Sequence, residues 1–359
     1  MRTDFFVIGC LLTLAACAPE PRVQTFTPPY PERLSEWQLF SAQQAPRLAP
    51  GVEPYQLNQP LFSDYAHKLR TLYLPPGGQA EYDPDEAFQF PAGTVVSKTF
   101  FYFTSQDHET MALSASWDGH PDTIADRPTR RIETRLLVKQ ADHWDALPYI
   151  WQGDDAYLAI TGGLLKLETS EGPINYLVPS RNQCASCHAT NHTTGQILPI
   201  GLKARHLNRP GVADTQNQLT AWHRSGRLAG LPASRDVPRS ATMAAGEDLD
   251  HQARSYLDIN CGHCHNRHGA ADTSGLLLDL KDHPLRAMGA CKPPIAAGRG
   301  SGGRFYSIVP GEPEASILSF RMASTDPGAM MPELGRTLVH TEGVALIDAW
   351  IRSLTGQCL

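Results

Sequence analysis

The sequence predicts a multi-domain chain of the α+β class, because strand-like and helix-like patterns occupy different parts of it. Its 359 residues, of which 41% are hydrophobic, are enough for two or three domains with buried cores. Residues 36–180 show strand patterns, whereas residues 246–359 show helical spacing. We therefore expect a β-rich N-terminal domain at 36–180, a small module at 181–245 and an all-α domain at 246–359.

Strand patterns recur through the first predicted domain. Apolar or β-branched residues alternate with charged ones over 132–139, and the segment 144–151 follows a short polar turn, which predicts a β-hairpin. The segments 69–74 and 94–103 have the composition of further strands, and frequent Pro and Gly residues separate the elements. We expect the aromatic residues of this domain in its core, and no catalytic constellation is evident in it.

The first residues are typical of an export signal. One arginine precedes an apolar run over 5–16, which is shorter than the roughly 20 residues of a membrane-spanning helix. The run ends with Leu-Ala-Ala before Cys17, which resembles a lipobox, the bacterial signal whose cysteine is lipidated and becomes the new N-terminus. We predict a signal peptide at 1–17 with a lipid on Cys17; ordinary cleavage after Ala18 is the alternative.

A lipid on Cys17 would hold the mature protein at a membrane surface of the cell envelope. Ala18 follows the cysteine, which favours a periplasm-facing lipoprotein of the outer membrane. Five prolines within residues 18–35 predict an extended linker between this anchor and the folded part of the chain.

Two short cysteine motifs carry the main functional signal. Each has the pattern C-x-x-C followed at once by His, which is the attachment signature of c-type haem. The two thiols of such a motif add to the two vinyl groups of one porphyrin, and the imidazole of the next residue reaches the iron. The two motifs are Cys184-Ala-Ser-Cys187-His188 and Cys261-Gly-His-Cys264-His265.

Other roles for these cysteine pairs explain less of the pattern. Two C-x-x-C pairs can supply four thiolates to zinc, and they can also form disulfides or a thioredoxin-like redox pair. None of these roles requires a histidine after each second cysteine. Export also agrees with covalent haem attachment, which takes place outside the cytoplasm. We therefore predict two covalently bound haem c groups, with His188 and His265 as iron ligands; His263 and His268 are expected at the surface or behind the ligands.

Two further cysteines, Cys291 and Cys358, have no role in these motifs. In an oxidising compartment leftover thiols most often pair. We predict a disulfide between them, which would close a long loop around the second haem; two separate buried thiols are the alternative.

The second motif lies between two predicted helices. Apolar residues at helical spacing predict an amphipathic helix over 247–260 and a closing helix over 341–354, with Thr341 as its N-cap. The order of helix, C-x-x-C-H, long loop region and closing helix resembles the class I cytochrome c fold. The resemblance implies an all-α, class I cytochrome c-like domain at 246–359.

A class I domain takes its sixth iron ligand from a loop between the motif and the last helix. The loop at 327–335 lies in this interval, and its Met331, followed by proline, resembles the Met-Pro of such ligand loops. A soft thioether favours ferrous iron and raises the reduction potential. Met331 is the predicted ligand, with Met330, Met322 and His340 as alternatives.

The first motif has no comparable frame, because the proline-containing and β-favouring lead-in at 172–180 disfavours an entry helix. A short helix over 216–226 is possible downstream. The sixth ligand of the first haem remains open, and a vacant sixth position would suit an enzyme. The candidates are His192, His206, His223 and Met243, or no ligand.

Two kinds of partner have no support in the sequence. The net charge is −6, from 31 basic and 37 acidic residues without a long charge run, so a nucleic-acid partner is not expected. The glycines at 298, 300 and 303 match G-x-G-x-x-G, but the strand-turn-helix context of a dinucleotide site is missing. We expect no nicotinamide cofactor.

Several segments together resemble an uncharacterised family of bacterial di-haem c-type cytochromes. They are "LFSDYAHKLRTLYLPPG", "YLDINCGHCHN", "SGLLLDL", "CKPPIAAGRGSGG" and "MPELG" followed by "GVALIDAWI". The resemblance implies the iron ligands His188 and His265, supports Met331 and implies no particular reaction. We expect single-electron transfer between redox partner proteins of the cell envelope. The alternative is a haem enzyme, peroxidase-like or part of an oxidoreductase, that uses an open first haem.

Overall fold

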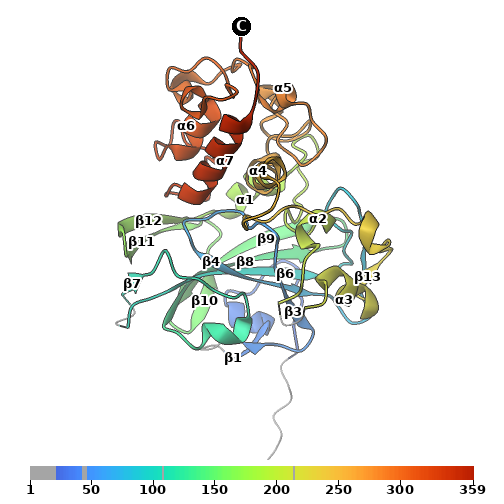
Figure 1. Ribbon diagram of the computed structural model, residues 1–359. Helices are drawn as coiled ribbons and strands as arrows, with labels where there is room; N and C mark the ends of the chain where they lie inside the picture. The colour runs from blue at the N-terminus through green and yellow to red at the C-terminus, as the bar shows by residue number, and fades with distance from the viewer. Residues whose placement is uncertain (1–21, 43–46, 107–108, 213–214) are drawn as a thin grey trace, which may run out of the picture.

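The computed structural model describes residues 22–42, 47–106, 109–212 and 215–359. The predicted signal peptide and Cys17 lie outside these residues. Figure 1 shows a β-rich part that contains the main sheet, with the C-terminal helices stacked on one side of it. Within the described ranges, no helix has the length and apolar composition needed to cross a bilayer.

The main sheet consists of six antiparallel strands in the order β10-β9-β8-β6-β4-β3. The predicted hairpin is confirmed, because β8 and β9 pair in register from Glu133 opposite Ile150 to Lys139 opposite Trp144. The two other predicted strands correspond to β4 and β6, and β4 pairs with β6 along its whole length. The strands are β3 (Val52–Tyr55), β4 (His67–Tyr73), β6 (Val95–Phe103), β8 (Thr129–Lys139), β9 (Trp144–Gln152) and β10 (Asp155–Leu158).

Three smaller sheets surround the main one. The first has the order β12-β11-β7, the second pairs β1 with β2, and the third pairs β13 with β5 in parallel. Their strands are β1 (Phe40–Ala42), β2 (Arg47–Leu48), β5 (Ala80–Glu81), β7 (Thr110–Met111), β11 (Gly163–Thr169), β12 (Gly172–Val178) and β13 (Leu228–Ala229). The pairing of β13 with β5 attaches the middle of the chain to the β-rich part.

Side chains alternate between the two faces of the main sheet along each strand, so each strand presents residues to both faces. Both faces are covered by a hydrophobic core. On one face Val95, Leu136 and Val138 pack in a core with Trp37 from the N-terminal segment. On the other face a second core contains Leu72, Val96 and Leu137 together with Cys184, Leu202 and Trp222. The first cysteine motif therefore rests on this second face of the sheet.

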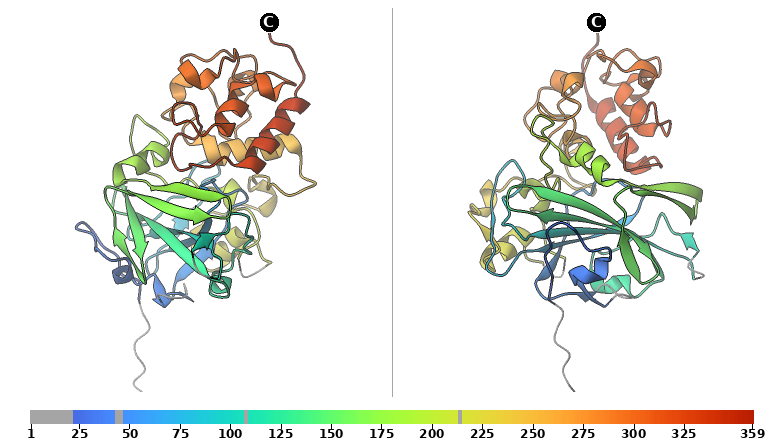
Figure 2. Two further views of the ribbon diagram at one scale, coloured as in Figure 1. Left: turned by 90° about the vertical axis from the view of Figure 1, so that its left-hand side faces the viewer. Right: turned by 180° about the vertical axis from the view of Figure 1, so that it is seen from behind.

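The helices lie after the strands in sequence and are mostly short. Figure 2 shows α4 to α7, in orange and red, on one side of the sheet in both views. The α-helices are α1 (Arg181–His188), α2 (Ala204–Leu207), α3 (Gln218–Arg224), α4 (Leu249–Leu257), α5 (Leu285–Met288), α6 (Ile317–Ala323) and α7 (Thr341–Ser353). The 3₁₀ and π segments are η1 (Leu34–Trp37), η2 (Pro121–Ile124), η3 (Ser234–Asp236), η4 (Asp258–Gly262, π), η5 (Asp272–Ser274), η6 (Gly298–Ser301) and η7 (Pro313–Ala315).

The two helices predicted from apolar spacing are present as α4 and α7. They pack against each other, and Leu257, Ile347 and Trp350 are completely buried between them and their neighbours. The helix α7 begins at Thr341, so its N-cap is His340 and the predicted cap Thr341 is wrong by one residue. The short helix expected over 216–226 corresponds to α3.

The predicted fold class is wrong in its last part, because no all-α class I cytochrome c domain is evident in the described residues. The structure is β-rich, is dominated by the six-stranded antiparallel sheet and has about 24% of its described residues in helices. Helical spacing identified α4 and α7 correctly, but the segment between them consists mainly of irregular backbone and single turns. Periodicity reports single elements, and it does not report how they assemble.

A buried ion pair connects the middle of the chain to the second motif. Arg205 in α2 donates from Nε and Nη2 to Asp258 at 2.7 and 3.0 Å, and Leu280 N donates to the same carboxylate at 3.0 Å. His206 Nε2 lies 3.4 Å from Asp258 Oδ2. Burial alone would raise the pKa of Asp258, but Arg205 and His206 outweigh it and hold that pKa below its usual range.

The buried His206 predicts a loss of stability in mild acid. Burial lowers its pKa to about 3 in the folded chain, against about 6.5 in the unfolded chain. Below pH 6.5 His206 is therefore protonated in the unfolded chain but stays neutral in the folded chain. We expect the free energy of unfolding to be unaffected by this group above pH 6.5 and to fall by up to about 1.4 kcal/mol per pH unit below it. Denaturant titrations at pH 7.5, 6 and 5 measure this slope, and His206→Asn should reduce it; an unaltered slope contradicts the assignment.

Candidate functional site

The first cysteine motif occupies helix α1, which begins directly after strand β12. Ser180 caps this helix: its Oγ accepts from Gln183 N at 3.3 Å, and Gln183 Oε1 accepts from Ser180 N at 2.9 Å. The sequence contains this signal, because Ser-x-x-Gln is a capping box. The prediction made from the lead-in at 172–180 did not include this capping box. The cap fixes the direction in which Cys184, Cys187 and His188 leave the sheet.

The imidazole of His188 is oriented by one hydrogen bond. Its Nδ1 donates to the carbonyl oxygen of Leu198 at 2.7 Å, which leaves Nε2 with its lone pair available to a metal. Burial lowers the pKa of His188 to about 3, with a further contribution from Lys98. The ring is therefore neutral at physiological pH, which is the form that binds iron.

The second motif begins inside the π segment η4 and continues as a turn. His265 N and Cys264 N both donate to the carbonyl oxygen of Cys261, at 2.9 and 3.0 Å. The Oγ of Ser274 donates to Ala271 O at 2.6 Å and therefore accepts from His265 Nδ1, which lies 3.1 Å away. As in the first motif, Nε2 remains available, and burial lowers the pKa of His265 to about 4.

The four motif cysteines are neutral thiols. Burial raises the pKa of Cys261 and of Cys264 to about 12, and it also raises the pKa of Cys184 and of Cys187.

No set of three or more His, Cys, Asp or Glu side chains in the described part of the chain is arranged to hold a metal ion. A structural zinc ion takes four protein ligands. A haem iron takes its four equatorial ligands from the porphyrin, so one or two protein ligands suffice. In each motif a single oriented histidine lies beside a pair of thiols, which is the set of groups that covalent haem c requires.

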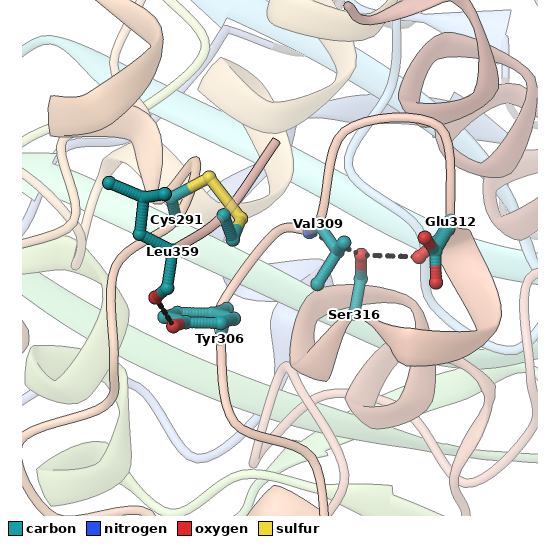
Figure 3. The surroundings of a disulfide bond; sticks show 7 residues. Cys291, Tyr306, Val309, Glu312, Ser316 and Leu359 are labelled. Atoms are coloured by element: carbon teal, nitrogen blue, oxygen red, sulfur yellow. Dashed lines mark hydrogen bonds between the residues drawn. A yellow bond between two sulfur atoms is a disulfide. The ribbon is translucent and has the colours of Figure 1, made fainter. Parts of the chain in front are cut away.

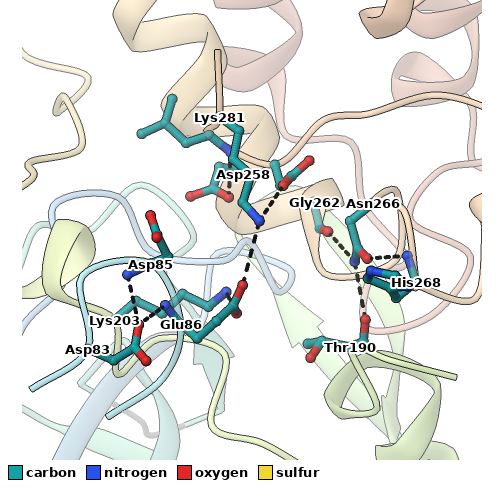
Figure 4. A network of polar contacts seen from close by, with 12 residues as sticks. Asp83, Asp85, Glu86, Thr190, Lys203, Asp258, Gly262, Asn266, His268 and Lys281 are labelled. Carbon is teal, nitrogen blue, oxygen red and sulfur yellow. Dashed lines mark hydrogen bonds and ion pairs between the residues drawn. The ribbon is translucent and has the colours of Figure 1, made fainter. Parts of the chain in front are cut away.

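The two motifs lie in contact although they are 77 residues apart in sequence (261 minus 184). Cys264 Sγ donates to the carbonyl oxygen of Ser186, between the cysteines of the first motif, at 3.3 Å. Figure 4 shows the neighbouring contact, in which Asn266 Nδ2 donates to Thr190 O at 3.3 Å. His192 N donates to His268 O at 2.8 Å. The chain segments of the two attachment sites are thus joined by direct hydrogen bonds.

A small cavity adjoins the second motif and brings together Cys261 and the predicted ligand Met331. The other residues around it are Phe62, Tyr256, Asn260, Met322, Pro332, Arg336, His340 and Val344. Cys261, a haem anchor in the prediction, and Met331, the predicted iron ligand, therefore line the same largely apolar cavity although they are far apart in the sequence.

A buried arginine holds the loop of Met331 in place. Arg336, 5% exposed, donates to the carbonyl oxygens of Met331, Ser324 and Leu338 at 2.9, 2.9 and 3.0 Å. Met331 N in turn donates to Arg321 O at 3.0 Å. These bonds fix the backbone on both sides of the predicted ligand.

The alternatives to Met331 take different positions. Met322 and His340 contact the cavity, whereas Met330 is not among its lining residues. His340 is already engaged, since its Nδ1 lies 2.9 Å from Tyr256 Oη and its ring stacks on Phe62 with 4.3 Å between the ring centroids.

Of the candidate sixth ligands of the first haem, His206 is committed elsewhere, whereas His192 and His223 are hydrogen-bonded through Nδ1 alone, as His188 is. His206 uses both ring nitrogens, with Ser240 Oγ 3.3 Å from Nδ1 and Asp258 beside Nε2. His192 Nδ1 donates to Gly269 O and His223 Nδ1 to Leu228 O, both at 2.9 Å. Met243 is 40% exposed.

The two remaining histidines of the second motif differ. His268 is exposed, as expected, but His263 is buried, with only 8% of its surface accessible. Of the two positions predicted for His263, at the surface or behind the ligands, burial excludes the first. His263 lies between the two anchor cysteines with its side chain buried in the protein. Its Nδ1 has no hydrogen-bond partner among the described residues.

Cys291 and Cys358 form a disulfide with an S–S distance of 2.09 Å, as Figure 3 shows. The adjoining backbone is fixed on both sides: Cys291 N donates to Ile308 O at 2.9 Å, and Tyr306 Oη donates to Leu359 O at 2.5 Å. The bond ties the end of the chain, after α7, to the segment that follows α5.

Removal of this disulfide is expected to destabilise the protein. It links residues separated by 67 positions, and a crosslink of this kind stabilises a protein by about 2–4 kcal/mol through the unfolded chain. The double variant Cys291→Ala/Cys358→Ala should unfold at correspondingly lower guanidinium concentration. Reduced wild-type protein should match it, because the haem cysteines are not in disulfides. Equal midpoints for the variant and the oxidised wild type would refute the contribution.

Comparison with protein-family models, with curated proteins and with solved structures gives no match to this chain.

Proposed function

We propose that this protein is a di-haem c-type cytochrome that transfers single electrons in the bacterial cell envelope. The observation that carries the proposal is the contact between the two C-x-x-C-H motifs, where His192 N, just after the first motif, donates to His268 O, just after the second. Two attachment sites in direct contact favour passage of an electron from one group to the other. Haem c, when bound, supplies one-electron chemistry between ferric and ferrous iron.

The chain contributes anchors, ligands and orientation. Cys184 and Cys187 would form the thioether bonds of the first haem, with His188 as its iron ligand. The hydrogen bond from His188 Nδ1 to Leu198 O fixes the tautomer and increases the donor strength of Nε2.

The second site has the same division of roles. Cys261 and Cys264 would anchor the haem, and His265 would bind its iron while Ser274 orients the ring. Met331 would bind the other side of the iron. Its position on the cavity that Cys261 also lines supports this assignment.

The partners in this proposal are an electron donor and an acceptor protein of the envelope. Export and a lipid on Cys17 would keep the cytochrome at a membrane surface near them; these N-terminal features lie outside the described residues.

Haem counting tests the proposal. The exported protein, produced in a host that matures c-type cytochromes, should contain two covalent haems per chain by pyridine haemochrome assay and by mass. The variants Cys184→Ala/Cys187→Ala and Cys261→Ala/Cys264→Ala should each retain one. The matched control Cys291→Ala/Cys358→Ala should retain two. A wild-type chain without covalent haem would disprove the proposal.

The engagement of His206 favours one alternative, an enzyme with an open first haem. His206 has both ring nitrogens occupied, so it is not free to bind iron without breaking its contacts to Ser240 and Asp258. If the ferrous protein binds carbon monoxide at one haem and the ferric protein consumes peroxide, the enzyme is favoured. Two six-coordinate haems that ignore both reagents favour the carrier.

A further inference from the structure

A row of like charges crosses the main sheet on the face that carries the first motif. Arg70 on β4 lies directly opposite Lys98 on β6, and Lys98 lies directly opposite Arg135 on β8. Lys68 belongs to the same face, two residues before Arg70. Directly opposite residues of neighbouring strands have Cβ atoms about 4.5–5.5 Å apart, and like charges at this distance destabilise a sheet.

The described residues neutralise only part of the charge of this row. Glu133 is committed to Arg135, whose Nη2 and Nε donate to it at 2.5 and 2.7 Å, and it also accepts from Tyr176 Oη at 2.8 Å. The carboxylate of Asp64 accepts two backbone N–H groups, from Thr337 and Leu338, at 2.7 Å each.

Lys98 is the cation without a partner. It makes no hydrogen bond or ion pair within the described part of the chain, and its Nζ lies 5.2 Å from the centre of the Phe100 ring. Lys68 and Arg70 are each only 9% exposed, and they donate to backbone carbonyl oxygens, Ala66 O and Lys68 O, rather than to an anion. Burial, followed by Arg135 and Arg70, lowers the pKa of Lys98 to about 7. Buried cations without counter-charges destabilise a fold. We therefore expect this row of cations to be neutralised by anions of a bound group.

The row lies next to the first motif. Cys184 packs in the same core as Leu72, Val96 and Leu137, which are on the row's face of β4, β6 and β8. The helix α1 contacts the neighbouring strand β9. The charge on Lys98 also acts on Cys187 and His188, and the charge on Arg135 acts on both cysteines of this motif.

We propose that Arg70, Lys98 and Arg135 bind the propionate carboxylates of the haem attached at Cys184 and Cys187. This inference rests on the proposed function. A haem c brings two carboxylates, which match the excess of positive charge, and attachment at α1 keeps the macrocycle on this face of the sheet. Charge-assisted hydrogen bonds to carboxylates are the favourable state of a buried guanidinium or ammonium group.

Lys98→Met tests the proposal, because it removes the unpartnered charge at similar volume and strands no other side chain. In the holoprotein it should lower the potential of the first haem, since a cation near the carboxylates favours the reduced iron. We expect a shift of about tenfold toward the ferric form, which is about 59 mV for one electron. Lys98→Gln, which keeps a polar side chain, should give the same direction. The matched control Arg130→Met removes an exposed cation from the neighbouring strand β8 and should leave both potentials unchanged.

The first haem is measured separately in the background Cys261→Ala/Cys264→Ala, which retains only that group. A shift in this background supports the proposal. Unchanged potentials overturn it, and so does a holoprotein that Lys98→Met makes more stable, which is the result expected if no anion meets the row. A shift confined to the second haem also overturns it. A wild-type chain without any covalent haem would instead refute the proposed function, and this inference with it.

Discussion

Replacement of Met331 by Ala is expected to lower the reduction potential of the second haem by on the order of 100 mV, within the range of about 0.8 V over which axial ligands act. A thioether stabilises ferrous iron more than water or a vacant position does, so its loss favours the ferric state. The vacant position should also bind carbon monoxide. Spectroelectrochemical titration and the ferrous carbon monoxide spectrum measure the two effects.

Neighbouring methionines provide the controls for this prediction. Met330→Ala should leave the potential of the second haem unchanged, because Met330 is not among the residues that line the cavity beside Cys261. Met322 does line it and is 6% exposed, so Met322→Ala should reduce stability without opening the iron. If Met331→Ala leaves the potential unchanged while Met322→Ala lowers it, the ligand is Met322 and the assignment from the Met-Pro pattern is wrong.

Local patterns predicted the elements of this chain well. The alternation over 132–139 and the turn after it gave the hairpin of β8 and β9, and helical spacing gave α4 and α7. These predictions succeed because the spacing of apolar residues depends only on which face of a single helix or strand is buried. The C-x-x-C-H spacing is equally local, and both motifs place a histidine with one oriented nitrogen beside thiols, of which Cys184 is buried and the other three are half-buried.

Assembly could not be predicted in the same way. The expectation of a separate all-α cytochrome domain used the order of helices, but the contacts of Asp64 with Thr337 and of Arg205 with Asp258 join segments far apart in sequence. The row of cations could not be predicted from the sequence either, because Arg70, Lys98 and Arg135 become neighbours only through the register of the strands. The burial of His263 follows from packing around η4, for which the sequence between two cysteines contains no signal.

Asp258→Asn is expected to reduce the free energy of unfolding by about 3–5 kcal/mol, because it leaves the buried Arg205 guanidinium without its counter-charge. Asp258 and Arg205 are 4% and 6% exposed, so water does not replace the lost partner. The guanidinium denaturation midpoint of the holoprotein measures the loss. The ion pair stabilises the fold above the pKa of an unfolded aspartate, about 3.9, and its contribution falls as the pH drops below that value.

Two comparisons separate this ion pair from a general effect of charge removal. Glu314→Gln breaks an exposed pair with Arg352, 2.8 Å apart, and should leave the midpoint unchanged. The double variant Asp258→Asn/Arg205→Met removes both buried charges and should cost less than the sum of the two single variants. Strict additivity would show that the two side chains do not act together. Since Asp258 lies three residues before Cys261 and Arg205 lies in α2, loss of the pair should also loosen the contact between the two motifs, which slower electron transfer between the haems would reveal.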